Sequence, residues 1–149
     1  MLKQVTIYTI RILFMILFTY AAISKLQDYS HFKFQLGRSP FIQHIAPFVA
    51  IALPIGELLI AVLLITQKWY RIGIYLSFFT MLLFTGYIYA MLNYSYFLPC
   101  SCGGILNNMD WHTHFIFNII VTTIALLGIF IKEKDGETQS HNKQLVTPV

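Results

Sequence analysis

Four long apolar segments constrain this chain more than any other feature of its sequence. They cover residues 5–23, 45–65, 72–92 and 115–131, and residues 111–114 extend the last of them. Each is close to the roughly 20 residues that a helix needs to cross a bilayer. Helices in the cores of soluble proteins rarely stay apolar for so long. The sequence therefore predicts an all-α integral membrane protein whose four spans pack as a four-helix bundle.

The composition agrees with this class and excludes several others. Only 11% of the residues are charged and 57% are hydrophobic, whereas soluble domains carry about 25% charged residues. An ordinary cytosolic globule, a disordered chain and a disulfide-dense secreted miniprotein are thus excluded. The net charge of +4 comes from scattered basic residues without a basic run, so it does not indicate a nucleic-acid partner.

The first apolar segment has a competing interpretation as a cleaved signal peptide, because Lys3 and Arg11 precede an apolar stretch that ends near Ala21 and Ala22. However, Arg11 stands where the apolar core of such a peptide should begin, and the small-residue cleavage pattern is poor. The sequence therefore favours a retained span.

Lys and Arg residues are spread unequally over the connections. Three lie in the connection 24–44 and none in 93–114, while six lie on the opposite side: Lys3, Lys68, Arg71, Lys132, Lys134 and Lys143. Because basic loops stay in the cytoplasm, we expect an inner-membrane protein with both termini cytoplasmic and both connections outside, facing the periplasm.

Two segments outside the spans have distinct characters. Residues 29–44 mix Phe32, Leu36 and Phe41 with polar residues, which predicts a short amphipathic segment on the bundle or at the membrane interface. Residues 132–149 are polar and charged without an apolar period, which predicts a disordered cytoplasmic tail. The expected organisation is one transmembrane domain, 1–131, followed by this tail.

The only two cysteines, Cys100 and Cys102, lie one residue apart in the outer connection, after Pro99 and before two glycines. A disulfide between such near neighbours closes a small ring and is easily reduced. An oxidising space outside the membrane would allow the pair to cycle. Two idle cysteines in a turn are the alternative. We predict Cys100 and Cys102 as the catalytic residues of thiol–disulfide exchange.

Trp111, His112 and His114 follow the cysteine pair closely. Cysteine and histidine are ligands of zinc and copper(I), but the spacing is not a standard metal pattern, and the two histidines point to different faces of a helix. We therefore predict no metal site. These three residues are instead expected to pack, or to support proton transfer beside the redox pair.

Arg11 and Glu57 are charged residues within predicted spans. An unpaired charge in the bilayer is costly, so the sequence predicts an intramembrane ion pair between them that fixes the packing of two spans. Proton or quinone chemistry at Glu57 is the alternative. Asn118 is expected to form an interhelical hydrogen bond.

Several motifs together resemble a known family. They are Ala22-Ile23-Ser24-Lys25-Leu26 with Asp28 and Phe32, then Ser39-Pro40, Pro54 and Glu57, then the cysteine loop with Trp111, His114 and Asn118. In this order they resemble the DoxX/MauE group of small four-helix membrane proteins, and the loop resembles the redox-associated MauE branch. The resemblance covers residues 5 to about 131.

The resemblance implies a function. Proteins of the MauE type work with a thioredoxin-like partner in maturing methylamine dehydrogenase, so a thioredoxin-like extracytoplasmic partner is expected here. Membrane oxidoreductases of the DsbB and VKOR type are also similar, but they carry Cys-x-x-Cys and usually a second pair, whereas this chain has one Cys-x-Cys. A membrane quinone is a candidate cofactor that no motif specifies.

The sequence thus predicts a multi-pass membrane protein that transfers electrons through its cysteine pair, a candidate thiol–disulfide oxidoreductase. A non-enzymatic accessory or anchoring subunit and a Cys/His metal-handling protein are the alternatives. A small transporter is less consistent with the sequence, because the spans carry few charges and no paired broken helices.

Overall fold

The computed structural model describes the backbone of residues 2–95 and 110–146, and the side chains of residues 4–95 and 110–131. All regular elements in these ranges are helices. They are α1 (Leu2–Gln27), α2 (Tyr29–Gly37), the short 3-10 helix η1 (Gln43–Ile45), α3 (Ala46–Ile65), α4 (Tyr70–Tyr94) and α5 (Trp111–Val146).

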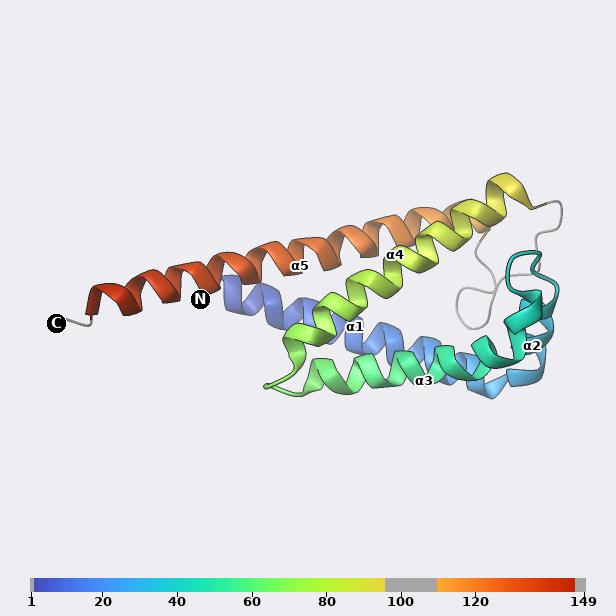
Figure 1. Ribbon diagram of the computed structural model, residues 1–149, viewed down its shortest axis with the longest axis horizontal. Coiled ribbons are helices and arrows are strands. Elements are labelled where there is room, and N and C mark those ends of the chain that lie inside the picture. The colour runs from blue at the N-terminus through green and yellow to red at the C-terminus, as the bar shows by residue number, and fades with distance from the viewer. Residues whose placement is uncertain (1, 96–109, 147–149) are drawn as a thin grey trace.

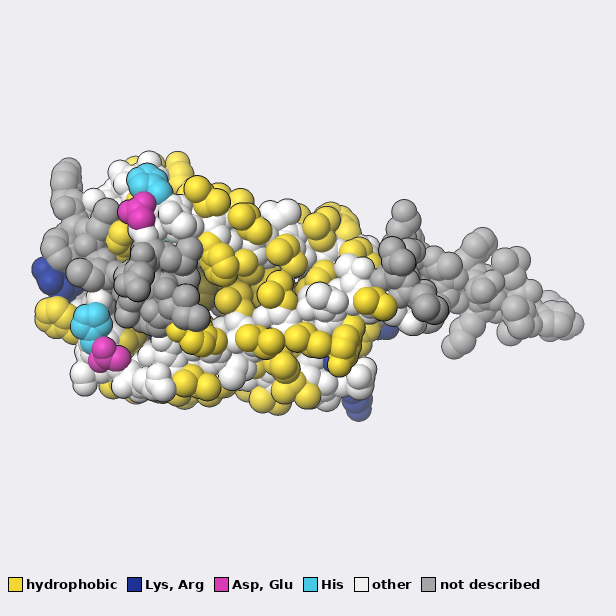
Figure 2. Space-filling model, turned by 180° about the vertical axis from the view of Figure 1, so that it is seen from behind, with side chains coloured by type: hydrophobic (Ala, Val, Ile, Leu, Met, Phe, Trp, Pro, Cys, Tyr) yellow, Lys and Arg dark blue, Asp and Glu magenta, His cyan; other side chains and the backbone are white. Residues whose placement is uncertain are grey.

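Four helical stretches are long and apolar enough to cross a membrane: Gln4–Gln27, Gln43–Ile65, Tyr70–Tyr94 and Trp111–Ile131. This confirms the four predicted spans and the all-α membrane fold. Large apolar side chains remain exposed along every span, and Figure 2 shows them covering one flank of the bundle. A bundle of this size cannot bury so many large apolar side chains within itself, so this surface is suited to contact with lipid.

The spans are arranged as two helix pairs. Helix α1 packs mainly on α3, and α4 packs mainly on α5. The pairs are joined by the tight turn between α3 and α4, and they diverge toward the end that carries α2 (Figure 1). The start of α1 and the far end of α5 lie toward the opposite end. The even number of spans therefore brings both ends of the chain to the same side.

The main core lies between the pairs, near the end where they meet. Phe14 and Phe18 of α1 stack with their ring centroids 6.0 Å apart, against buried residues of the other three spans. Gly73 of α4 lies so close to α3 that an added Cβ would stand 3.1 Å from the backbone nitrogen of Leu64. A glycine at this position is what allows the two helices to approach so closely.

Helix α2 lies at the end of the bundle where the helix pairs diverge (Figure 1), which confirms the expected amphipathic segment. The Asp28 carboxylate caps the helix by accepting a hydrogen bond from the His31 backbone N–H. Phe32 and Leu36 are buried against Ala46 and Ala50 of α3. The small alanine side chains let the apolar face of α2 come close to the spans.

Helix α5 continues past its apolar part to Val146, where the sequence analysis expects a disordered tail from residue 132. The residues after Ile131 include several Glu, Lys and Gln and no proline before Pro148. These are good helix formers, and extending an existing helix is far easier than starting one. The domain boundary at residue 131 and the disorder of the tail stay predictions.

Candidate functional site

The predicted catalytic pair, Cys100 and Cys102, lies outside the described residues. The chain that carries it leaves α4 at Ser95 and returns at Asp110, directly before α5. Both anchors stand at the end of the molecule where the helix pairs diverge (Figure 1). The role of the cysteines therefore stays a prediction, and the described part of the site is the neighbouring interior of the bundle.

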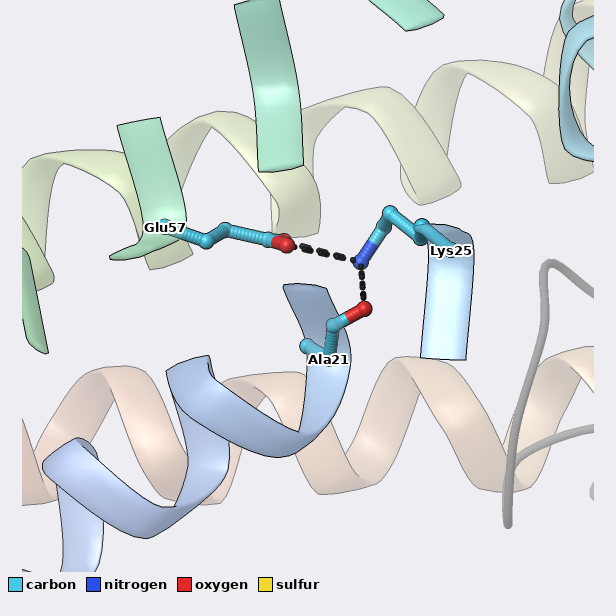
Figure 3. A network of polar contacts seen from close by, with 3 residues as sticks. All are labelled: Ala21, Lys25 and Glu57. Atoms are coloured by element: carbon cyan, nitrogen blue, oxygen red, sulfur yellow. Dashed lines mark hydrogen bonds and ion pairs between the residues drawn. The ribbon is translucent and has the colours of Figure 1, made fainter. Parts of the chain in front are cut away.

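A buried ion pair joins α1 to α3 in this interior. The Lys25 ammonium donates to both carboxylate oxygens of Glu57, with Nζ–Oε1 and Nζ–Oε2 distances of 2.8 and 3.1 Å. It also donates to the backbone carbonyl of Ala21, 3.2 Å away (Figure 3). Glu57 is 1% exposed and Lys25 9% exposed. The ammonium thus has three acceptors, which compensate for its removal from water.

The predicted pairing of Arg11 with Glu57 is wrong. The Arg11 guanidinium instead donates to the last carbonyls of α3, those of Leu64 at 3.0 and 2.7 Å and of Ile65 at 3.2 Å. It also stands 4.4 Å from the ring centroid of Tyr70.

The physical reason is the register of two antiparallel helices. Glu57 lies seven residues from Leu64, or about 10 Å along the axis of α3, so Arg11 faces the end of that helix instead of Glu57. The final carbonyls of a helix lack intrahelical donors and carry partial negative charge, which makes them suitable partners for a guanidinium. Lys25, counted as a loop residue in the sequence analysis, is the partner of Glu57.

Next to the ion pair lies a cavity of about 370 Å³ between the two helix pairs. Every α-helix contributes to its lining, for example through Lys25, Phe32, Glu57, Tyr87 and His114. Most of the lining is aliphatic or aromatic, and the volume is within the roughly 300–1,000 Å³ typical of small-molecule sites. The cavity was not foreseen, because it depends on how far the helix pairs diverge.

The histidines take separate positions at the start of α5. The Asp110 carboxylate accepts a hydrogen bond from the His112 backbone N–H and so caps the helix. The side chain of His112 is exposed, whereas that of His114 is half-buried and lines the cavity together with Trp111. The prediction that the two histidines point to different faces is confirmed. No group of three or more metal-ligating residues occurs among the described residues.

Asn118 makes a different bond from the one expected. It is buried, and its amide nitrogen donates to the carbonyl of His114 within α5, 2.9 Å away. Among the described residues, this amide nitrogen therefore bonds within its own helix and not to a neighbouring helix as predicted. The hydroxyls of Thr85 and Thr122, 3.1 Å apart, join α4 to α5 instead. An amide can reach a carbonyl of the preceding turn as easily as a neighbouring helix.

Tyr87 and Ser39 form a polar contact that no sequence pattern predicts. The Tyr87 hydroxyl donates to the fully buried Ser39 hydroxyl, 2.8 Å away. The contact ties the segment after α2 to α4, and Tyr87 also lines the cavity. The Ser39-Pro40 dipeptide was the only sequence signal near it.

A comparison with protein families identifies one match. The model of the methylamine utilisation protein MauE family matches residues 3–131, which include all four spans and the cysteine loop. No curated protein and no solved structure matches the chain.

Proposed function

The chain belongs to the MauE family, and on this premise we propose that it is a membrane thiol–disulfide oxidoreductase. Cys100 and Cys102 exchange electrons with a thioredoxin-like protein outside the cytoplasm. The family description names methylamine utilisation, and the pathway we propose within it is the maturation of a disulfide-rich enzyme such as methylamine dehydrogenase. A relationship of the chain to the DoxX proteins is likewise part of what we propose.

The observation that carries the proposal is the placement of the cysteines in the chain. They are the only two cysteines of the protein, and one residue separates them. Their connection ends at Asp110, directly before Trp111, which lines the cavity between the helix pairs. A cysteine pair in a connection outside the spans is where a partner protein could reach it, so this position in the sequence supports the proposal.

The exchange proceeds in two balanced steps. A thiolate of one protein attacks a disulfide sulfur of the other, which forms a mixed disulfide and releases one thiolate. The second thiolate of the attacking protein then displaces the partner and closes a new disulfide. In total, one dithiol is oxidised and one disulfide is reduced, with two electrons and two protons transferred.

The proposed location follows from the basic residues. We place the protein in the inner membrane, with both termini in the cytoplasm and the cysteine connection in the periplasm, because basic loops stay in the cytoplasm. This location requires the two connections 24–44 and 93–114 to lie on the same side of the membrane. The fold supports this, since α2 and the anchors of the cysteine connection share one end of the molecule (Figure 1). Trp111 and His114 support the redox pair from the first turn of α5.

Cysteine variants test the proposal in cells that depend on the pathway. We expect Cys100→Ser and Cys102→Ser to abolish function and leave the fold intact, because so short a loop closure restricts the unfolded chain very little. One of the two variants should accumulate a mixed disulfide with a thioredoxin-like protein, which non-reducing electrophoresis and mass spectrometry would identify.

Ser101→Ala is the matched control, because it changes the same loop without removing a thiol; it should behave like the unaltered protein. Full pathway function in the double variant Cys100→Ser/Cys102→Ser would overturn the redox mechanism. That result would favour an accessory or anchoring subunit. Stoichiometric zinc or copper that is lost on replacing His114 would point instead to metal handling.

A further inference from the structure

The cavity between the helix pairs has an uneven distribution of free polar groups. The Lys25 ammonium and the Glu57 carboxylate are hydrogen-bonded to each other, and the amide nitrogen of Asn118 is bonded to the His114 carbonyl. By contrast, the rings of His114 and Trp111 have no hydrogen bond among residues 4–95 and 110–131. Both rings line the cavity, with centroids 6.4 Å apart.

A half-buried imidazole without a hydrogen bond indicates the chemistry of a ligand. A neutral imidazole carries one donor and one acceptor nitrogen, so it can donate to a carbonyl or accept from a hydroxyl at the same position. The nearby lysine does not call for an anion, because Glu57 already neutralises it at 2.8 Å. The polar part of the ligand is therefore a neutral group with carbonyl or hydroxyl oxygens.

The remaining walls indicate the shape of the ligand. Phe18, Phe84 and Phe117 line the cavity along with Trp111, and aromatic side chains favour stacked or edge-on contacts with a planar ring. Leu83 also lines the cavity and is 56% exposed. On this side the cavity opens to the lipid-facing surface of α4, which offers an apolar tail a way out.

We propose that this cavity binds a lipid-soluble molecule with a planar ring head that bears carbonyl or hydroxyl oxygens and with an apolar tail, the chemistry of a membrane quinone and its quinol. The ring lies among the aromatic side chains, and the His114 imidazole bonds its oxygen in either redox form. A role of this ligand as electron acceptor or donor rests on the proposed function. Its binding does not, so the two can fail separately.

The test uses the full-length protein in lipid nanodiscs and a fully substituted, short-tailed benzoquinone. Because the ring has no free position, thiols cannot add to it, and the Cys100→Ser/Cys102→Ser background removes the thiols altogether. The chain has two tryptophans, so Trp69→Phe leaves Trp111 as the sole indole reporter. We expect the quinone to quench Trp111 fluorescence saturably, and an alkyl alcohol of the same tail length not to compete.

The matched pair His114→Leu and His112→Leu separates a site from partition into lipid. His112 lies two residues before His114, about half a helical turn away, and its side chain is exposed. Its replacement should therefore leave the half-saturating quinone concentration unchanged. His114→Leu should raise that concentration about tenfold, the effect of losing one hydrogen bond to a ligand. Ala21→Phe, which fills the cavity from α1, should raise it as well.

Three results would overturn the inference. They are quenching that rises linearly with quinone, displacement by the alkyl alcohol, and equal behaviour of the two histidine variants. Circular dichroism confirms that each variant is folded before it is scored. If saturable binding is found but the cysteine variants support the pathway, the ligand site stands and the proposed redox function fails.

Discussion

At the scale of single residues, the polar contacts inside the spans determine how the helices pair. Glu57 has Lys25 as its partner, and Arg11 bonds to the end of α3. A sequence shows that a charge in a membrane needs a partner, but not which one. The choice depends on helix register and on the reach of a long side chain. Arg11 and Glu57 were therefore identified as buried charges, whereas Lys25 was assigned to a connection and the pairing was wrong.

The ion pair predicts a specific pattern of stabilities. Glu57→Gln should destabilise the protein by about 3 kcal/mol, because the buried Lys25 ammonium loses its counter-charge and keeps only neutral acceptors, such as the Ala21 carbonyl. Adding Lys25→Met should recover part of this loss, since the uncompensated charge is then gone. Unfolding of the single and double variants in mixed micelles would measure the coupling.

Arg11 supplies the control for this cycle. Arg11→Met should also destabilise the protein, because the carbonyls of Leu64 and Ile65 lose their donor. In combination with Glu57→Gln its effect should be additive, as the two groups share no hydrogen bond. Strong coupling between Arg11 and Glu57, together with additivity between Lys25 and Glu57, would contradict the contacts described above.

At the scale of helices, the sequence was informative about the spans and about α2, and much less about how closely they approach. Apolar length alone identifies the spans, and the pattern around Phe32 and Leu36 identifies an amphipathic segment, which the structure shows to be a helix. The closeness of α3 and α4 depends on one residue, Gly73. Nothing in the sequence distinguishes Gly73 from Gly86 thirteen residues later, because the difference lies in the neighbouring helix.

These two glycines of α4 predict opposite outcomes. Gly73→Ala places a Cβ 3.0 Å from Leu64 Cδ2 and 3.1 Å from its backbone nitrogen, and such overpacking costs about 1–3 kcal/mol. One of the atoms met is backbone, which cannot turn away as a side chain can, so we expect a cost above the roughly 1 kcal/mol that alanine contributes over glycine in a helix. The variant should therefore melt at a lower temperature.

Gly86→Ala is the matched control on the same helix. A Cβ at Gly86 meets nothing within 4 Å, so only the gain in helix propensity remains, and thermal stability should stay unchanged or rise. Circular dichroism melts in detergent would compare the two variants. A Gly73→Ala protein as stable as the Gly86→Ala protein would show that the close approach of α3 and α4 is not required.

At the scale of the whole molecule, the fold has two ends with different chemistry. One end carries α2, the anchors of the cysteine connection and the cavity, and the other carries the turn between α3 and α4 (Figure 1). The order of the four spans was enough to predict which connections share an end, whereas the orientation predicted from the basic residues stays a prediction. The cavity was not predictable, because it arises from the divergence of two helix pairs, which no local pattern encodes.

This polarity makes a prediction about topology that two cysteine reporters can test. The native cysteines should react with a membrane-impermeant thiol reagent in intact spheroplasts after mild reduction, because their connection is proposed to face the periplasm. Lys68, exposed in the turn at the opposite end, provides the matched position. In the Cys100→Ser/Cys102→Ser background, Lys68→Cys should be labelled only after lysis. Labelling of both reporters in intact spheroplasts would contradict the fold. If Lys68→Cys were labelled in intact spheroplasts and the native cysteines only after lysis, the cysteine pair would lie in the reducing cytoplasm. The thiol–disulfide proposal would then lose the oxidising compartment on which it depends.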